Sequence, residues 1–298
     1  MEPSRLPNLL LIGFQKCGTS ALHYYLDLHP EIEMSSPKEL DYFAAEPRLE
    51  ALAGAPASER EAVAARAGNW ERGIDWYASH FSGRTPVRGE SSPSYTAPWH
   101  PDAAERIHAT IPETQLIALV RDPLEQIPSA WLHEHGLGRE PRLLERAIEP
   151  RGIYVERLRY RARLTPFLER FGRERLLVVP QRDLLQDRRE TMRRAFAFLG
   201  VDESVWSERM KRLRHVSAAK TRRRRILERM QSSRLARPAY RLPGEAKWLI
   251  ERVVSRPGSA GDRPALPPEA RELISRELAP DVEWLQAELG VDTTAWLR

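Results

Sequence analysis

A short segment near the amino terminus constrains the fold more than any other part of the chain. Residues 9–12 are four consecutive apolar side chains, as in a buried strand, and a loop bounded by Gly13 and Gly18 follows them. The apolar positions after the loop recur at helical spacing: Leu22, Tyr25 and Leu26. Backbone N–H groups at the start of such a helix, together with the helix dipole, favour a bound phosphate. The segment therefore predicts a strand, a phosphate-binding loop and a helix.

The loop differs from the one that binds nucleoside triphosphates. That loop reads G-x-x-x-x-G-K-[ST], with lysine directly after the second glycine. Here Thr19 occupies the lysine position, and Lys16 lies inside the loop. Taken alone, the pattern is explained more simply by a glycine turn between a strand and a helix, so a second motif has to decide.

The second motif covers residues 116–136, where an apolar run ends at Arg121 and Ser129 falls on the helix that follows. The carboxyl ends of parallel strands are where open α/β sheets bind ligands. A guanidinium fork suits a terminal phosphate, and a serine hydroxyl can donate to the same group. The alternative is a helix cap at Asp122 with Arg121 in a surface ion pair.

Together the two motifs resemble the sulfotransferases that use 3'-phosphoadenosine 5'-phosphosulfate (PAPS). The resemblance is closest to the branch that contains the heparan sulfate N- and O-sulfotransferases and their bacterial relatives. It implies that the first loop binds the 5'-phosphosulfate, through Lys16, Cys17, Gly18, Thr19, Ser20 and Ala21. It also implies that Arg121 and Ser129 hold the 3'-phosphate. Further matches occur in family order: His29-Pro30, Pro37-Lys38-Glu39, Tyr42-Phe43, residues 89–95, residues 151–154 and residues 198–200.

The same resemblance assigns the chemistry. Sulfuryl transfer needs a base for the acceptor proton and a donor for charge on the leaving phosphate oxygen. The family carries a catalytic glutamate in the context K-E-x-x-[YF]-F, which here is Glu39, and Lys16 would serve the leaving group. Lys38 would help to hold the sulfonate or would be solvated. The chain departs from the heparan-type pattern at Ser91, where those enzymes carry a lysine, and this weakens the inference of an anionic glycan acceptor.

Weaker candidates surround these residues. Tyr95 and His133 are candidates for binding the acceptor, and His133 is the first alternative base. A thiol at a helix amino terminus, such as Cys17, can have a lowered pKa, although a small packing role is the simpler interpretation. None of the histidines shows metal-ligand spacing, and we expect no metal.

Alternating strand and helix patterns predict one α/β domain over residues 1–298. We expect a P-loop-like fold with a mainly parallel central sheet flanked by helices. The expected strands are Leu9–Gly13, Ile32–Met34, Val87–Glu90, Gln115–Val120 and Leu176–Pro180, and the expected helices are 99–110, 123–136, 155–171 and 187–199. Residues 44–68 are expected as a helical, partly mobile surface insertion. Two helices around Pro280 are expected near the carboxyl terminus.

The net positive charge of the chain is also compatible with a second class of function, nucleic-acid binding. The formal net charge is +5, which suits an anionic co-substrate and equally nucleic acid. The most basic segment lies within residues 204–263, and by family habit Lys220, Arg222 and Arg223 would cover the 3'-phosphate. The Arg222–Arg225 run lacks the interleaved aromatic residues that single-stranded nucleic acid requires, so no nucleic-acid partner is expected.

Composition and the amino terminus predict a cytoplasmic protein without an integral membrane segment. No run approaches the ~20 apolar residues that cross a bilayer, and no signal-peptide pattern precedes the first strand. A single cysteine excludes an internal disulfide. The sequence thus predicts a PAPS-dependent sulfotransferase acting on a hydroxyl or amine of a glycan, lipid, phenol or peptide natural product. A kinase-like P-loop phosphotransferase and a nucleic-acid-binding module are the alternatives.

Overall fold

The structure is a computed structural model that describes residues 5–64, 66–136, 138–211 and 264–298. Its strands are β1 (Leu9–Gly13), β2 (Ile32–Met34), β3 (Val87–Ser91), β4 (Gln115–Val120) and β5 (Leu176–Pro180). The helices of the first half are α1 (Thr19–Leu26), α2 (Ala57–Ala64), α3 (Ile74–Ala78), α4 (Ala103–Thr110) and α5 (Pro123–Gly136). Those of the second half are α6 (Leu144–Ala147), α7 (Ile153–Glu156), α8 (Tyr160–Phe171), α9 (Gln181–Gln186), α10 (Arg188–Leu199) and α13 (Pro268–Leu289). Short 3₁₀ turns also occur, including η1 (Leu49–Leu52), η2 (Trp70–Arg72) and η3 (Pro93–Thr96).

The five strands form one sheet in the order β2-β3-β1-β4-β5. Every pair is parallel, and β1 lies between β3 and β4, so that Leu10 is opposite both Glu90 and Leu116. The side chains of β1 are fully buried, which explains why its sequence is a continuous apolar run rather than an alternating one. The predicted parallel α/β architecture is confirmed.

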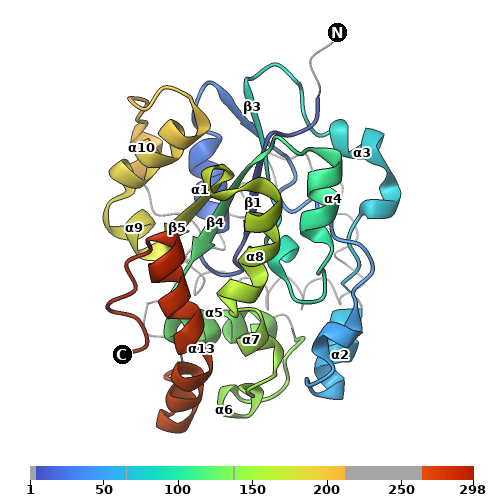
Figure 1. The fold of residues 1–298 in the computed structure, drawn as a ribbon, viewed down its shortest axis with the longest axis vertical. Helices are drawn as coiled ribbons and strands as arrows, with labels where there is room; N and C mark the ends of the chain where they lie inside the picture. Colours follow the sequence, from blue (N-terminus) through green and yellow to red (C-terminus); the bar gives the residue numbers. More distant parts are fainter. Residues whose placement is uncertain (1–4, 65, 137, 212–263) are drawn as a thin grey trace, which may run out of the picture.

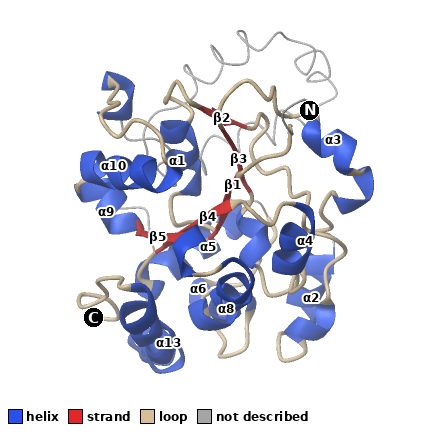
Figure 2. Ribbon diagram, turned by 45° about the horizontal axis from the view of Figure 1, so that its top comes forward, coloured by secondary structure: helices blue, strands red, loops and turns tan. Residues whose placement is uncertain are grey.

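Helices cover both faces of this sheet. Figure 2 shows α1, α9 and α10 on one side and α4 and α8 on the other. In Figure 1 α13 lies beside α5, α7 and α8, and it packs against all three. The core therefore runs on both sides of the sheet and leaves the carboxyl ends of the strands to carry loops.

Close packing at that edge fixes the start of the first loop. A Cβ atom at Gly13 would lie 2.5 Å from the Oγ1 atom of Thr96, so no larger residue fits there without movement. Gly18 has φ +102°, in the left-handed region that favours glycine, and it begins α1. The two glycines thus serve different purposes, close approach at one end of the loop and backbone conformation at the other.

Two expectations about the flanking segments are wrong in part. The carboxyl-terminal segment is one helix, α13, with Pro280 inside it, because buried residues on both sides of the proline, among them Leu278 and Val282, keep the segment packed. Residues 44–68 do form helical structure, but they are not only a surface insertion. Leu52 and Val63 are buried in the core, and residues 66–68 reach the cavity described next.

Candidate functional site

A cavity of about 570 Å³ opens at the carboxyl edge of the sheet. Its wall includes the loop after β1, the end of β4 and the segment that follows β2, three parts far apart in the sequence. The predicted site residues on this wall are Lys16, Gly18, Thr19, Ser20, Ala21, Glu39, Arg121 and His133. The structure therefore brings most of the first motif, Arg121 of the second motif and the predicted base to one cavity.

The loop after β1 presents backbone donors to the cavity. Gly18 begins α1, and the Ala21 N–H group donates to its carbonyl over 2.9 Å. The N–H groups of Thr19 and Ser20, the first two residues of the helix, have no intrahelical acceptor and are left for water or a ligand. Lys16 precedes this turn with φ +67°, a conformation that is uncommon for a residue with a side chain. The donor set fits an oxyanion.

Cys17 belongs to the core rather than to the cavity wall. It is fully buried, and burial raises the pKa of its thiol to about 12 despite the nearby cations Arg121 and Lys16. A lowered thiol pKa is therefore wrong for this residue, and the packing role is the correct interpretation.

Arg121 is held in place from two directions. Its Nη2 atom donates to Glu125 over 2.8 Å, and its Nη1 atom donates to the carbonyl of Lys16 over 3.4 Å. The side chain is 5% exposed, so the alternative of a surface ion pair does not describe it, although the pair with Glu125 exists. Asp122 caps α5 by accepting from the Leu124 N–H group over 3.0 Å, as that alternative supposed.

Ser129 lies on α5 but is not part of the cavity wall. It is 1% exposed, and its buried Oγ atom has no hydrogen-bond partner within the described ranges. An orphaned hydroxyl of this kind calls for an explanation, and a ligand oxygen reached after a small movement would supply one.

Glu39 and Asp41 reach the cavity from a strained loop. Their φ angles are +64° and +48°, and both side chains line the cavity. Lys38 forms an ion pair with Glu39, whose side chain is 53% exposed, and is not itself on the cavity wall. Burial raises the pKa of Asp41, although hydrogen bonds from Ser94 and Ser92 oppose this.

A buried carboxylate supports this loop from below. Glu90, at the end of β3, is fully buried and accepts hydrogen bonds from Tyr77 over 2.6 Å and from Tyr95 over 2.9 Å. Ser92 also donates to Glu90, and its Oγ atom accepts from the Asp41 N–H group over 2.9 Å. Tyr95 therefore supports the loop from within the core and does not reach the cavity as an acceptor-binding residue.

Sequence reasoning missed a group of arginines on the same wall. Arg66, Arg139 and Arg157 come from three distant segments, and only tertiary folding brings them together. Nothing in their local sequence distinguishes them from other arginines, so no motif could have found them. Lys220, Arg222 and Arg223 lie outside the described residues.

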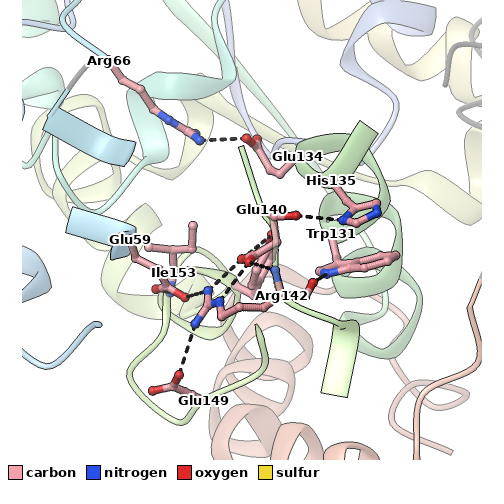
Figure 3. Close-up of polar contacts among 10 residues, drawn as sticks. Glu59, Arg66, Trp131, Glu134, His135, Glu140, Arg142, Glu149 and Ile153 are labelled. Carbon is pink, nitrogen blue, oxygen red and sulfur yellow. Dashed lines mark hydrogen bonds and ion pairs between the residues drawn. The ribbon is translucent and has the colours of Figure 1, made fainter. Parts of the chain in front are cut away.

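An ion network next to the cavity joins α2 to the segment after α5, as Figure 3 shows. Arg142 donates to Glu140 over 2.7 Å and to Glu149 over 3.2 Å, and it also pairs with Glu59 of α2. Glu59 in turn accepts from the N–H group of Ile153 at the start of α7 over 2.8 Å. The network fixes the position of α2, and therefore of the residues that follow it on the cavity wall.

Two absences apply to the described residues alone. Among them, no group of three or more histidine, cysteine, aspartate or glutamate side chains is arranged to hold a metal ion. Within the same ranges, none of the helices combines the length and apolarity needed to span a membrane.

Comparison with known proteins identifies the class of the chain. Residues 7–208 match the model of the sulfotransferase family, and the chain belongs to that family. The resemblance inferred from the motifs is therefore confirmed.

Two curated relatives share part of this region. The chain is 34% identical over 131 residues to membrane-associated sulfotransferase Kil1 of Dictyostelium discoideum, a match that covers 42% of the chain and 22% of the relative. It is 32% identical over 135 residues to bifunctional heparan sulfate N-deacetylase/N-sulfotransferase 3 of Mus musculus, covering 44% and 13%. The matched region thus spans less than a quarter of the length of either relative.

A solved structure supports the fold over nearly the whole chain. The sulfotransferase from Alicyclobacillus acidocaldarius superposes with a TM-score of 0.66 at 23% identity, covering 98% of this chain and 99% of that one. The predicted P-loop-like fold of one parallel sheet flanked by helices is confirmed.

Proposed function

We propose that the protein transfers a sulfuryl group from PAPS to a hydroxyl or amine of an acceptor. One observation carries the proposal. The loop of Lys16, the nearly buried Arg121 and the carboxylate of Glu39 come from three separate segments and line one cavity at the sheet edge. Family membership supports the same reaction class.

The residues present suit the donor. PAPS supplies an activated sulfuryl group and two phosphate positions. The first turn of α1 and Lys16 offer N–H groups and an ammonium to the phosphosulfate, and Arg121 offers a fork of donors to the 3'-phosphate. We assign Lys16 to the bridging oxygen of the phosphosulfate, where charge grows as the S–O bond breaks.

Glu39 is assigned to the acceptor. As the acceptor oxygen or nitrogen attacks sulfur in line, its proton passes to the Glu39 carboxylate, and the 5'-phosphate leaves with the bond electrons. The ion pair with Lys38 orients the Glu39 carboxylate. Neither assignment requires a metal, and we expect turnover to be unchanged by EDTA.

Two substitutions test these roles. Glu39→Gln keeps the size of the side chain but removes its basicity, so turnover should fall by ~10²–10⁴ while the affinity for 3',5'-adenosine bisphosphate is retained. Lys16→Ala should lower affinity and turnover together, because Lys16 contacts both the ground state and the leaving oxygen. Calorimetry for the bisphosphate and turnover with labelled PAPS measure the two effects.

The control is Glu71→Gln, which changes an exposed glutamate of η2 away from the cavity. Near-normal turnover of Glu39→Gln would move the base elsewhere, with His133 and Asp41 next to be tested. ATP turnover that depends on Mg²⁺ would instead favour the phosphotransferase alternative. A steep salt dependence of RNA or DNA binding would favour the nucleic-acid alternative.

The candidate acceptors are a glycan, a lipid headgroup, a phenol and a peptide natural product. Incubation of the protein with labelled PAPS and a lysate of its host, followed by identification of the labelled product, would name the acceptor.

A further inference from the structure

Three guanidinium groups on the cavity wall, Arg66, Arg139 and Arg157, form what we call the arginine cluster. Arg66 follows α2, Arg139 follows α5 and Arg157 follows α7. Two members lie over the indole ring of Trp99, with the guanidinium carbon of Arg157 at 4.6 Å from the ring centroid and that of Arg66 at 5.6 Å. The proposed donor site does not use any of these four residues.

In the part of the chain that the structure describes, Glu134 is the carboxylate that pairs with all three members of the cluster. Glu134 lies behind the wall, 2% exposed, and accepts from Arg66 over 2.8 Å, a contact drawn in Figure 3. Arg157 and Arg139 are farther from it, at 3.9 Å and 4.0 Å. Within the described residues, three cations therefore share a single ion-pair partner.

Burial makes this imbalance costly. The side chain of Arg157 is 7% exposed and that of Arg66 is 18% exposed. Burial, with Arg66 as a second nearby cation, lowers the pKa of Arg157 to about 10, so the guanidinium is still charged at pH 7. Buried charges are normally paired, and an anionic ligand would complete the pairing of this cluster.

A neutral side chain nearby points to the same conclusion. His100 is 3% exposed and lines the cavity, and its buried Nδ1 atom has no hydrogen-bond partner among the residues that the structure describes. Burial, followed by the effect of Arg106, lowers the pKa of His100 to about 4, so the ring is neutral near pH 7. A buried polar atom on a cavity wall is satisfied when a ligand supplies its partner.

We propose that the arginine cluster, with Trp99 and His100, is an acceptor subsite that binds a carboxylate or sulfate ester on the acceptor. The inference rests on the proposed function, since it names the class of acceptor for that same cavity. Guanidinium forks bind planar carboxylates and sulfate oxygens through two parallel hydrogen bonds, which a neutral acceptor cannot offer.

Gln15 connects this subsite to residues 13–18, the loop that we propose binds the phosphosulfate and that we call the donor loop. Its side-chain oxygen accepts from Arg157 over 2.5 Å, and Lys16 is the next residue. An anion on the cluster would therefore lie close to the reacting group, so the acceptor should carry its charge near the hydroxyl or amine that is sulfated. The cluster would orient such an acceptor as well as select it.

The test compares three small sugars that differ at one position: D-glucuronate, D-glucose 6-sulfate and neutral D-glucose. Binding is measured by calorimetry with 3',5'-adenosine bisphosphate at saturation, so that the donor loop is filled. We expect at least one of the two anions to bind tenfold or more tightly than glucose. Tighter binding of glucuronate would identify a carboxylate as the preferred group, and tighter binding of glucose 6-sulfate would identify a sulfate ester.

Arg157→Gln and Arg66→Gln should each reduce this preference for the anionic sugar to about twofold or less. Arg48→Gln, which changes an exposed arginine outside the cavity, should retain it.

Each of the other outcomes contradicts either the anion subsite or the proposed function. Equal binding of all three sugars, or binding of none, overturns the anion subsite. A loss of bisphosphate affinity in Arg157→Gln as large as the loss of anion preference would assign the cluster to the donor and also overturn it. Failure of the wild-type protein to bind the bisphosphate would contradict the proposed function instead, and the anion preference measured without bisphosphate would still decide the subsite.

Discussion

Arg121 is held in a fixed position on the cavity wall, as the proposed contact with a phosphate requires. Its guanidinium is nearly buried and is held by Glu125 and the carbonyl of Lys16, so little conformational entropy remains to be lost on binding. Arg121→Ala should weaken 3',5'-adenosine bisphosphate by about ten- to hundredfold, the effect expected for a charge-assisted hydrogen bond. Calorimetry with the bisphosphate and with adenosine 5'-phosphosulfate, which lacks the 3'-phosphate, measures the difference. Equal weakening of both ligands would remove Arg121 from the 3'-phosphate.

Glu90 predicts an unusual dependence of stability on pH. Burial raises the pKa of this carboxyl to about 7, although hydrogen bonds from Ser92, Tyr77 and Tyr95 act in the opposite direction. Because the folded state holds the proton more tightly than the unfolded state, this contribution is present below pH ~4.5 and is lost as pH rises through about 7.

The stability of the wild-type protein relative to Glu90→Gln should therefore fall between pH 5 and pH 7.5, by an amount on the order of 3 kcal/mol. Urea unfolding of both proteins at the two pH values measures it, and the exposed Glu71→Gln serves as the control. Parallel stability curves for wild type and Glu90→Gln would show that Glu90 does not titrate in this range.

A residue's place on the cavity wall could be predicted from the sequence where a local motif contains that residue. Lys16, Arg121 and Glu39 stand in motifs that neighbouring residues define, and all three line the cavity. Arg66 and Arg157 have no such context, because their place on the cavity wall depends on where α2 and α7 pack. Tyr95 lies in a motif but not on the cavity wall, because its hydroxyl donates a hydrogen bond to Glu90 inside the core.

Elements were predictable where hydrophobic pattern and packing agree. Four of the five strands have the predicted bounds, and β3 extends one residue further, to Ser91. The expected helix 155–171 is instead α7 and α8, with a break near Arg159. That break could not be read from the apolar pattern, because Leu158 and Tyr160 on either side of it are both buried.

The ion network of Figure 3 gives a prediction at the scale of elements. Arg142 holds Glu59 of α2 and Glu140, which are 3% and 5% exposed at their side chains. Arg142→Gln would leave two buried carboxylates without their cation and should destabilise the protein by about 3 kcal/mol.

Arg175→Gln is the matched control, because Arg175 pairs with Glu113, which is 81% exposed. It should cost no more than about 1 kcal/mol. Urea unfolding of both variants makes the comparison, and equal losses would mean that the network around Arg142 does not anchor α2.

At the scale of the whole molecule, the donor loop and Arg121 follow the adjacent strands β1 and β4, so we expect binding of the proposed ligand to be coupled to folding. At 100 times its dissociation constant, 3',5'-adenosine bisphosphate should add about 2.7 kcal/mol to stability. The melting temperature should rise by roughly 5 °C, an increase measurable by calorimetry. Lys16→Ala should reduce the shift and Glu71→Gln should not. A shift in melting temperature that survives Lys16→Ala in full would place the bisphosphate elsewhere.

A cytoplasmic location stays a prediction from the sequence.

The donor loop with Arg121 and the arginine cluster, which are two parts of the cavity wall, should differ in how well they tolerate substitutions during evolution. The donor loop and Arg121 are continuous with central strands, so a substitution there disturbs the middle of the sheet. The arginine cluster stands on segments outside the sheet, which can lengthen, shorten or exchange side chains at less cost to folding. Relatives of this chain should therefore diverge first in the acceptor they select and last in the donor they consume. Exchanging residues 44–68 between two such relatives is the most direct route to a changed acceptor.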